Sequence, residues 1–315
     1  MSSIHAIVVD PEVPGQLAIK EVEAPQAGPS EALVQVEAIS LNRGEVALAM
    51  MQTEAGWRPG WDLAGTVIKQ AANEAGPKAG SRVVGSVPAG AWAEQVAVPT
   101  NRLAAIPDSI TFAQAATLPV AGLTALRALE KGGLLLNKRV LITGSTGGVG
   151  LFAHQLAKLN GAYVVGTVRQ ARHEALVREA GADEVIVGDD LAPARAYGPY
   201  DLIIESVGGK TLESALSLLA TGGTCVILGY AASPEATIDV RDLINTGRTT
   251  LYGLNMYHEF DSRSRSEDLA WLAQLVARQQ LRTSVAVEAS WHEIGEIAQR
   301  FLQRQFTGKA VLHLA

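Results

Sequence analysis

The stretch RVLITGSTGGVGLFAHQLAKLNGAYVVGTVR, residues 139–169, decides the fold. An apolar run, a glycine-rich turn, apolar residues at helical spacing and a second apolar run follow one another within about 30 residues. This order is typical of the strand–turn–helix–strand unit that binds dinucleotides. Its fingerprint matches as Ser145-x-Gly147-x-x-Gly150, with serine in place of the first glycine. We predict a pyrophosphate-binding loop here; a glycine-rich turn without a ligand is the alternative.

The sequence on either side of this stretch divides into three parts. After it, apolar runs such as EVIV, YDLIIESV and GTCVILG alternate with helical patterns, which indicates a doubly wound parallel sheet. The first 115 or so residues contain short alternating runs between turn residues, which indicates a mostly β segment. Two further helical patterns and the strands SVAVEA and KAVLHL close the chain, and we expect this tail to return to the N-terminal domain.

Length, charge and cysteine content exclude several classes of protein. A chain of 315 residues suggests about two domains. A net charge of -6 argues against nucleic acid or an anionic membrane as partner. We find neither the ~18 apolar residues in a row of a membrane helix nor a signal peptide, so we expect a cytoplasmic location. Cys225 is the single cysteine, and it lies in an apolar run without an internal disulfide partner.

The residues after the second strand indicate which dinucleotide is bound. NAD sites usually place an acidic residue there to accept hydrogen bonds from the ribose hydroxyls. In GTVRQARHEA no acid precedes Glu174, and Arg169, Arg172 and His173 lie nearby. A guanidinium can hold a 2'-phosphate by charge-assisted hydrogen bonds. NADPH is therefore expected in preference to NADH, unless these cations only face water.

Seven motifs together resemble the zinc-independent branch of the medium-chain dehydrogenase/reductase superfamily, in its quinone oxidoreductase-like group. In chain order they are AISLNRGEV, GWDLAGTV, AATLPVAGLTALRAL, GSTGGVG, IIESVGG, VILGY and GKAVLHL. The resemblance implies an α/β fold: a Rossmann doubly wound parallel sheet at residues 119–255, with a GroES-like β-rich catalytic domain formed by both chain ends, residues 1–118 and 256–315. It also implies a homodimer joined through Rossmann edge strands.

The metal ligands of the zinc dehydrogenases are missing from this chain. SLNRGEV stands where those enzymes carry a cysteine, and GWDLAG stands where they carry Gly-His-Glu. The six histidines are scattered and form no convincing metal-binding pattern. We therefore predict no catalytic metal, and we expect Asp62 to make a structural hydrogen bond or salt bridge.

The resemblance also implies which residues form the site. Asn42, Arg43 and Tyr257 are the catalytic candidates. The cofactor-binding candidates, taken position by position, are Asn42, Thr124, Thr146, Gly147, Gly148, Val149, Thr167, Arg169, Arg172, Val207, Gly229, Tyr230, Leu254, Asn255 and Lys309. The chain departs from the group at Ala47, His173 and Gly188, where tyrosine, lysine and tyrosine are common. These departures concern the substrate pocket and part of the phosphate clamp.

The predicted activity is transfer of hydride from NADPH to a small electrophile, a quinone or an α,β-unsaturated carbonyl, without metal. Such substrates delocalise the incoming charge to a distant oxygen, so that placing the two reactants is the main requirement. Two alternatives stay open. One is an enoyl-thioester reductase of a biosynthetic pathway; the other is a low-turnover NADPH-binding protein with a structural or regulatory role.

Overall fold

The computed structural model describes residues 2–51, 54–256, 258–259 and 264–314. The chain divides into two compact units. Unit 1 comprises Met1–Leu123 and Phe260–Ala315, and unit 2 comprises Thr124–Glu259. Each unit has its own sheet and its own hydrophobic core. Tyr257, one of the predicted catalytic residues, lies outside the described residues.

Unit 1 is built on a seven-stranded sheet in the order β14-β15-β3-β4-β5-β7, with β6 also paired to β3. Its strands are β3 (Glu31–Ser40), β4 (Asp62–Lys69), β5 (Arg82–Ser86), β6 (Gln95–Pro99), β7 (Leu103–Ala105), β14 (Val285–Ser290) and β15 (Lys309–His313). A separate antiparallel pair is formed by β1 (Ser3–Val9) and β2 (Leu17–Glu23). The closing strands of the chain therefore lie in the sheet of the N-terminal segment, as expected for the tail.

The register of this sheet gathers several chain segments at one end. Ser40, the last residue of β3, is opposite Asp62, which is in turn opposite Ser86. Strand β15 pairs with the same end of β3, and the Leu41 amide donates to the Ala310 carbonyl at 3.0 Å. Residues that follow β3, begin β4 and begin β15 are therefore neighbours, although up to 268 positions separate them.

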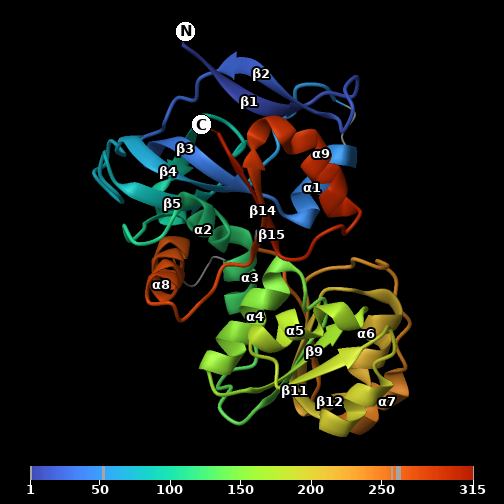
Figure 1. Ribbon diagram of the computed structural model, residues 1–315. Coiled ribbons are helices and arrows are strands. Elements are labelled where there is room, and N and C mark those ends of the chain that lie inside the picture. Colours follow the sequence, from blue (N-terminus) through green and yellow to red (C-terminus); the bar gives the residue numbers. More distant parts are fainter. Residues whose placement is uncertain (1, 52–53, 257, 260–263, 315) are drawn as a thin grey trace. The chain divides into compact units, whose positions relative to one another are not determined.

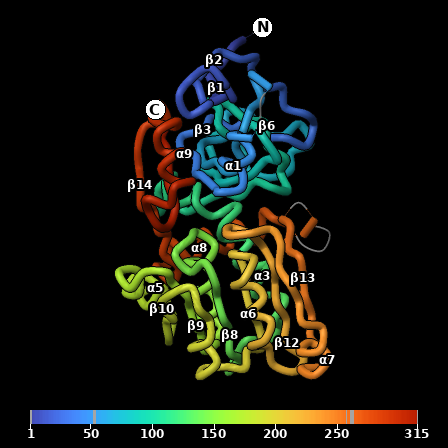
Figure 2. The backbone as a smooth tube through the Cα atoms, turned by 90° about the vertical axis from the view of Figure 1, so that its right-hand side faces the viewer, coloured from blue at the N-terminus to red at the C-terminus, as the bar shows by residue number. Residues whose placement is uncertain are grey.

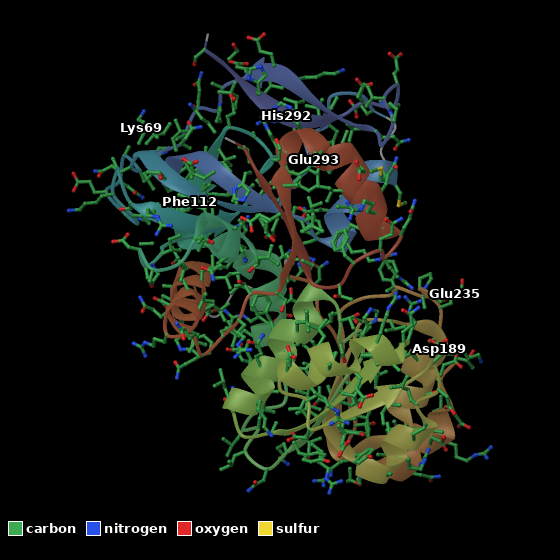
Figure 3. The ribbon with its side chains drawn as sticks, viewed as in Figure 1. Lys69, Phe112, Asp189, Glu235, His292 and Glu293 are labelled. Atoms are coloured by element: carbon green, nitrogen blue, oxygen red, sulfur yellow. The ribbon has the colours of Figure 1, made fainter. Side chains whose placement is uncertain are left out.

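The helical region where the chain passes from unit 1 to unit 2 differs from its sequence pattern. The apolar spacing between Thr111 and Gly132 predicts one helix with Thr111 as a possible N-cap, but the structure has α2 (Phe112–Ala116) and a π-helical turn η2 (Leu118–Gly122) in unit 1, followed by α3 (Leu123–Glu130), which lies almost wholly in unit 2. Pro119 lacks an N–H and cannot continue the α-helical ladder. Thr111 is the N-cap of α2, and it forms a capping box with Gln114. Phe112, labelled in Figure 3, is the first residue of this helix.

The remaining helices of unit 1 flank its sheet. They are α1 (Arg43–Met51), η1 (Thr100–Arg102), α8 (Arg265–Ala277), η5 (Trp291–Glu293) and α9 (Ile294–Leu302). Ser290 and Glu293 form a second capping box, which starts η5 before α9 (Figure 3). The start of α1, directly after β3, was not expected from the sequence, because this N-terminal segment was read as mostly β.

Unit 2 contains a six-stranded, wholly parallel sheet in the order β10-β9-β8-β11-β12-β13. The strands are β8 (Arg139–Ile142), β9 (Tyr163–Val168), β10 (Glu184–Val187), β11 (Tyr200–Glu205), β12 (Leu219–Ile227) and β13 (Thr250–Gly253). Numbered from β8, this is the dinucleotide-binding order 3-2-1-4-5-6. The order reverses between β8 and β11, where such sheets bind their ligands.

Helices cover both faces of this sheet. Figure 1 shows α4 (Gly148–Leu159) and α5 (Glu174–Glu179) on one side, and α6 (Gly209–Leu216) and α7 (Val240–Thr246) on the other. Two short 3-10 helices, η3 (Ala171–His173) and η4 (Ala192–Tyr197), lie in the connections. Figure 2 follows β12 and β13 side by side. No helix within the described residues combines the length and apolar character required to cross a bilayer.

His154 is a polar side chain within the core of unit 2. It lies on α4, fully buried, and neither ring nitrogen has a hydrogen-bond partner among the described residues. It packs on β9, where a Cβ added to Gly166 would be 2.8 Å from the His154 ring. Burial lowers the pKa of His154 to about 3. The imidazole is therefore neutral in the folded protein near neutral pH.

Acid should destabilise the protein through His154. The unfolded chain binds a proton below about pH 6.5, whereas the folded state excludes it, so stability is complete above that pH and falls as the pH falls. Between pH 7 and pH 5 the loss should be about 2 kcal/mol. His154→Leu should lose correspondingly less. Urea unfolding followed by far-UV circular dichroism measures both, and equal pH dependence in the two proteins would contradict this assignment.

Candidate functional site

The glycine-rich loop after β8 forms a tight cradle ahead of α4. Gly144 has a φ of 60°, and a Cβ on Gly150 would be 2.6 Å from the Gly144 carbonyl oxygen. The loop backbone therefore needs glycine at both positions. Helix α4 begins at Gly148 with Gly147 as its N-cap, and no side chain caps it. The first N–H groups of the helix are consequently available to a negatively charged ligand.

Ser145 explains why this loop departs from the usual fingerprint. Its buried hydroxyl donates to the Ile142 carbonyl at 2.8 Å and accepts from the Thr167 amide at 2.9 Å. The residue thus joins the end of β8 to the end of β9. Through these hydrogen bonds the serine connects the phosphate-binding loop to the end of β9, where the adenine ribose is expected.

Removing this hydroxyl should destabilise unit 2. Ser145→Ala would leave the Thr167 amide buried without its partner, which typically costs about 1–2 kcal/mol. Amide hydrogen exchange should show faster exchange at Thr167 and in the strand around it. Ser217→Ala, at the exposed end of α6, is a suitable control. Thr143→Val is not suitable, because the Thr143 hydroxyl donates to Glu205 in another loop. Unchanged protection at Thr167 would show that the bridge contributes nothing.

The loop after β11 is held by Glu205, a residue that the sequence analysis did not single out. Its buried carboxylate accepts hydrogen bonds from the Val207 amide at 2.8 Å, the Gly208 amide at 3.0 Å and the Thr143 hydroxyl at 3.0 Å. Burial raises the pKa of Glu205, and these three donors oppose the rise. The sequence did contain a signal for Glu205: it is an acidic residue at the end of an apolar parallel strand, next to the point where the strand order of the sheet reverses.

Further predicted residues lie on the loops at this carboxyl edge of the sheet. The Ala232 amide donates to the Val207 carbonyl at 2.7 Å, and a Cβ on Gly229 would be 2.9 Å from the Ser206 carbonyl oxygen. The Leu254 amide donates to the Ile227 carbonyl, which places Leu254 beside the end of β12. The residues brought to this edge of unit 2 are Thr146, Gly147, Gly148, Val149, Thr167, Val207, Gly229, Tyr230, Leu254 and Asn255.

Three cationic or titratable side chains follow the end of β9. Arg169 and Arg172 are exposed, and the Arg172 Nε donates to His173 Nε2 at 3.3 Å. Among the described residues, neither guanidinium has a carboxylate within 4.0 Å. The pKa of His173 is lowered by burial and then by the charges of Arg172 and Arg169. The group is an uncompensated positive cluster, which suits a phosphate.

Unit 1 carries a buried polar cluster at the end of its sheet. The Lys309 ammonium donates to Asn42 Oδ1 at 2.6 Å and to the Leu41 carbonyl at 2.8 Å, and it lies 3.5 Å from Asp62 Oδ2. Asn42 Nδ2 donates to Asp62 Oδ2 at 2.7 Å and to Glu45 Oε1 at 2.9 Å. All four side chains are at least nine-tenths buried. The expected structural role of Asp62 is confirmed by these contacts.

The donors around each carboxylate indicate where the charges lie. Asp62 accepts from Asn42, from the Ser40 hydroxyl and from the Val120 amide, so it behaves as an ionised acceptor paired with Lys309. Glu45 Oε2 has no hydrogen-bond partner among the described residues. Burial and then the Asp62 charge raise the pKa of Glu45 to about 8. Burial also raises the pKa of Asp62, and the Lys309 charge and the hydrogen bonds to Asp62 oppose that rise. Ionisation of Glu45 is therefore disfavoured near neutral pH, and Asp62 with Lys309 is the ion pair of the cluster.

Two further predicted residues, Arg43 and Thr124, have different surroundings. Arg43 is exposed, and its Nη1 donates to the Leu302 carbonyl at 3.2 Å. Thr124 is buried near the start of α3, as the first residue of unit 2. Glu45 was missed by the sequence analysis. The signal was present, since Asn42 precedes α1 and Glu45 accepts from its amide at 2.7 Å, the spacing of a capping box.

Potential metal ligands do not gather in the described part of the chain. No three side chains among its histidines, cysteine, aspartates and glutamates lie close enough together to hold a metal ion. In unit 1 the carboxylate of Asp62 is already engaged by Lys309, Asn42 and Ser40. These donors stabilise the carboxylate by charge and hydrogen bonding.

Two protein-family models match the chain, and their positions agree with the two folds. The alcohol dehydrogenase GroES-like domain matches residues 28–108, and the zinc-binding dehydrogenase model matches residues 148–278. The GroES-like domain falls in unit 1, and most of the second match falls in unit 2. The predicted fold class, a GroES-like domain with a Rossmann-like domain, is thereby confirmed.

Similar proteins include several oxidoreductases. The mitochondrial NAD(P)H oxidoreductase RTN4IP1 of Bos taurus is 36% identical over 231 residues, covering 64% of this chain and 58% of that protein. The 2-methylene-furan-3-one reductase of Solanum lycopersicum is 33% identical over 211 residues, covering 64% and 53%. The matches thus span little more than half the length of these curated relatives.

A solved structure extends the similarity over nearly the whole chain. A mycobacterial protein in complex with NADPH superposes with a TM-score of 0.86 at 27% identity, covering 98% of this chain and 99% of that one. A second mycobacterial structure with the same values is a quinone oxidoreductase. With the glycine loop, the strand order and both domain matches in agreement, the chain belongs to the medium-chain dehydrogenase/reductase superfamily, in its quinone oxidoreductase-like group.

Proposed function

We propose that this protein is an NADPH-dependent reductase that transfers hydride to quinones or α,β-unsaturated carbonyls without a metal ion. The observation that carries the proposal is the pairing of an uncapped glycine-loop helix with an uncompensated cationic cluster at the carboxyl edge of one Rossmann sheet. The activities named for the tomato and mycobacterial relatives support this reaction class.

The residues of unit 2 fit NADPH at both of its phosphate positions. The backbone cradle of Gly147 and Gly150, ahead of α4, suits a pyrophosphate, because a side chain on Gly150 would collide with the loop. Arg169 and Arg172 suit a 2'-phosphate, since no carboxylate neutralises them. The NADPH complex of a mycobacterial relative supports the same cofactor. NADPH, when bound, supplies the hydride and its electron pair.

The residues of unit 1 suit positioning rather than proton transfer. Both Nδ2 protons of Asn42 are engaged, one by Glu45 and one by Asp62, and its carbonyl accepts from Lys309. As a catalytic residue, Asn42 would therefore act by holding a fixed, dry polar surface near the reacting groups. Arg43 and Tyr257 remain candidates for contact with the substrate oxygen. Solvent supplies the proton in this scheme.

The metal-free part of the proposal rests on the chemistry of the residues at the two motif positions. Asn42 and Arg43 stand in the first motif, and Trp61 with Asp62 stands in the second. None of these except Asp62 is a usual zinc ligand, and Asp62 is paired with Lys309. An electron-poor C=C or quinone accepts hydride without a Lewis acid, because the charge spreads to an oxygen already conjugated to it.

The domain roles, assembly and location are part of the same proposal. We assign the GroES-like catalytic role to the predicted segments 1–118 and 256–315, and the NADPH-binding role to 119–255.

A homodimer is supported by β13, which ends the sheet, and by exposed apolar residues nearby, Val240 at 62% and Ile244 at 73% exposure. Sedimentation velocity of the protein and of Ile244→Asp tests it. The expected cytoplasmic location is tested by cell fractionation.

The activity is tested by following NADPH absorbance with a panel of quinones, enones and enoyl thioesters, with and without a chelator. We expect oxidation with a quinone or enone that the chelator leaves unchanged. Loss of activity with chelator would refute the metal-free mechanism. Turnover of thioesters alone would favour the biosynthetic enoyl reductase, and tight NADPH binding without any turnover would favour the binding protein.

A further inference from the structure

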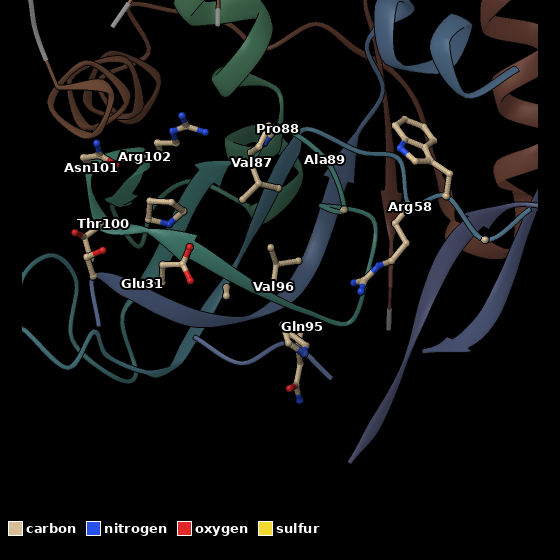
Figure 4. A pocket seen from close by; sticks show the side chains of 17 residues that line it. Glu31, Arg58, Val87, Pro88, Ala89, Gln95, Val96, Thr100, Asn101 and Arg102 are labelled. Atoms are coloured by element: carbon tan, nitrogen blue, oxygen red, sulfur yellow. The ribbon is translucent and has the colours of Figure 1, made fainter. Parts of the chain in front are cut away.

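Unit 1 contains a large cavity that the proposed reaction does not use. It is an open pocket of about 1040 Å³ that runs along strand β6, between the loop before β4 and the turn η1. Figure 4 shows Arg58 at one end and Glu31, Thr100 and Arg102 at the other, with Gln95 and Val96 between them. Small-molecule sites usually occupy about 300–1,000 Å³, so this volume suits an organic molecule rather than a bare inorganic ion.

Arg58 is the residue of this cavity whose state calls for an explanation. Its guanidinium is half buried, and its Nε is buried without a hydrogen-bond partner. Among the described residues, no carboxylate forms an ion pair with Arg58, and its side chain makes no hydrogen bond. Burial lowers the pKa of Arg58, although a guanidinium stays charged at any physiological pH. A half-buried cation without a counter-charge destabilises the protein that carries it.

The neighbouring charges do not compensate Arg58. Glu31 is the only acid among the described lining residues, and it accepts a hydrogen bond from the Gly28 amide at the opposite end of the cavity. Apart from Glu31, Arg58 and Arg102, the lining residues are apolar or neutral, and they include Trp57, Val87 and Pro88. A ligand with an apolar body and one anionic group would match both features.

We propose that this cavity of unit 1 binds an organic anion, a carboxylate or a phosphate ester with an apolar body, and that Arg58 is the residue that recognises its charge. The guanidinium donates two hydrogen bonds to such a group through its terminal Nη1 and Nη2 atoms, which, unlike the Nε, are not buried. The apolar lining beside Arg58 covers the body of the ligand. The site is distinct from the NADPH residues, all but Asn42 and Lys309 of which lie in unit 2.

The test is isothermal titration calorimetry of the full chain with three probes of similar shape: 3-phenylpropionate, phenyl phosphate and the neutral 3-phenylpropionamide. We expect one or both anions to bind and the amide to bind at least about ten-fold more weakly. The stronger of the two anions identifies the chemistry that the site prefers. Absence of binding by both anions, or equal binding of the amide, would overturn the proposal.

Substitutions separate Arg58 from the general charge of the cavity. Arg58→Gln should weaken anion binding at least about ten-fold while raising the melting temperature of the ligand-free protein, because the uncompensated cation is removed. Arg102→Gln, at the far end of the same cavity, should change neither. Arg58→Lys keeps the charge and should bind with intermediate affinity, which guards against a folding defect in the glutamine variant. Full binding by Arg58→Gln would exclude Arg58 as the recognition residue.

Discussion

Lys309→Met should destabilise unit 1 by about 3–5 kcal/mol, the usual cost of removing one partner from a buried ion pair. The Asp62 carboxylate would remain buried without its counter-charge, and Asn42 Oδ1 and the Leu41 carbonyl would each lose a donor. Double substitution with Asp62→Asn should restore part of this loss, because it removes the stranded charge. The residual deficit would measure the lost hydrogen bonds.

Tryptophan fluorescence during urea unfolding reports this effect on unit 1 alone. All five tryptophans of the chain belong to unit 1: Trp57, Trp61, Trp92, Trp271 and Trp291. Lys20→Met provides the control, since Lys20 is half exposed in its pair with Asp10 and should contribute far less. Equal losses in the Lys309 and Lys20 variants would refute the claim that the buried cluster holds this end of the sheet together.

Arg169→Ala should weaken NADPH binding about 10- to 100-fold and leave NADH binding nearly unchanged. A charge-assisted, two-point contact to a phosphate contributes about 1.5–3 kcal/mol, and NADH has no 2'-phosphate to lose it. Adding Arg172→Ala to this variant should bring the dissociation constants of NADPH and NADH still closer to each other. Fluorescence titration of the reduced nicotinamide measures the dissociation constants of NADPH and NADH for the unchanged protein and for both variants.

Arg178→Ala is the matched control for that experiment. Arg178 lies on the same segment but is already paired with Glu174 and Glu184, so its removal should not alter cofactor preference. An unchanged preference in Arg169→Ala would reject the clamp at this position. A loss shared equally by NADPH and NADH would instead show that Arg169 supports the loop rather than the 2'-phosphate.

The sequence was most informative where local pattern and fold demand the same residues. Residues 139–169 predicted β8, α4 and β9 because apolar spacing and glycine conformation both constrain them. The pattern was less informative where polar residues form regular structure. Helix α7 has no fully buried residue, and β13 has only four residues, so neither gives a clear periodic signal. Pro119, visible in the sequence, was the clue to the break between α2 and α3.

The candidate sites divide in the same way. The loop residues Gly147 and Gly150 follow from backbone geometry that a motif records. Glu45 and Arg58 owe their properties to burial produced by distant segments, Lys309 and Asp62 in one case and the turn after β5 in the other. A pKa raised to about 8 at Glu45 cannot be read from its neighbours in the chain. Such residues emerge only when the packing is known.

The Ser145 hydroxyl has a consequence for protein engineering. The Ser145 oxygen atom hydrogen-bonds to the Thr167 amide, so the pyrophosphate loop and the end of β9 should move together. Redesign toward NADH at the end of β9 will therefore shift the pyrophosphate cradle whenever it moves the Thr167 backbone. A library that varies residues 169–173 while keeping Ser145 should change selectivity without losing overall affinity, and libraries that also vary position 145 should lose both together.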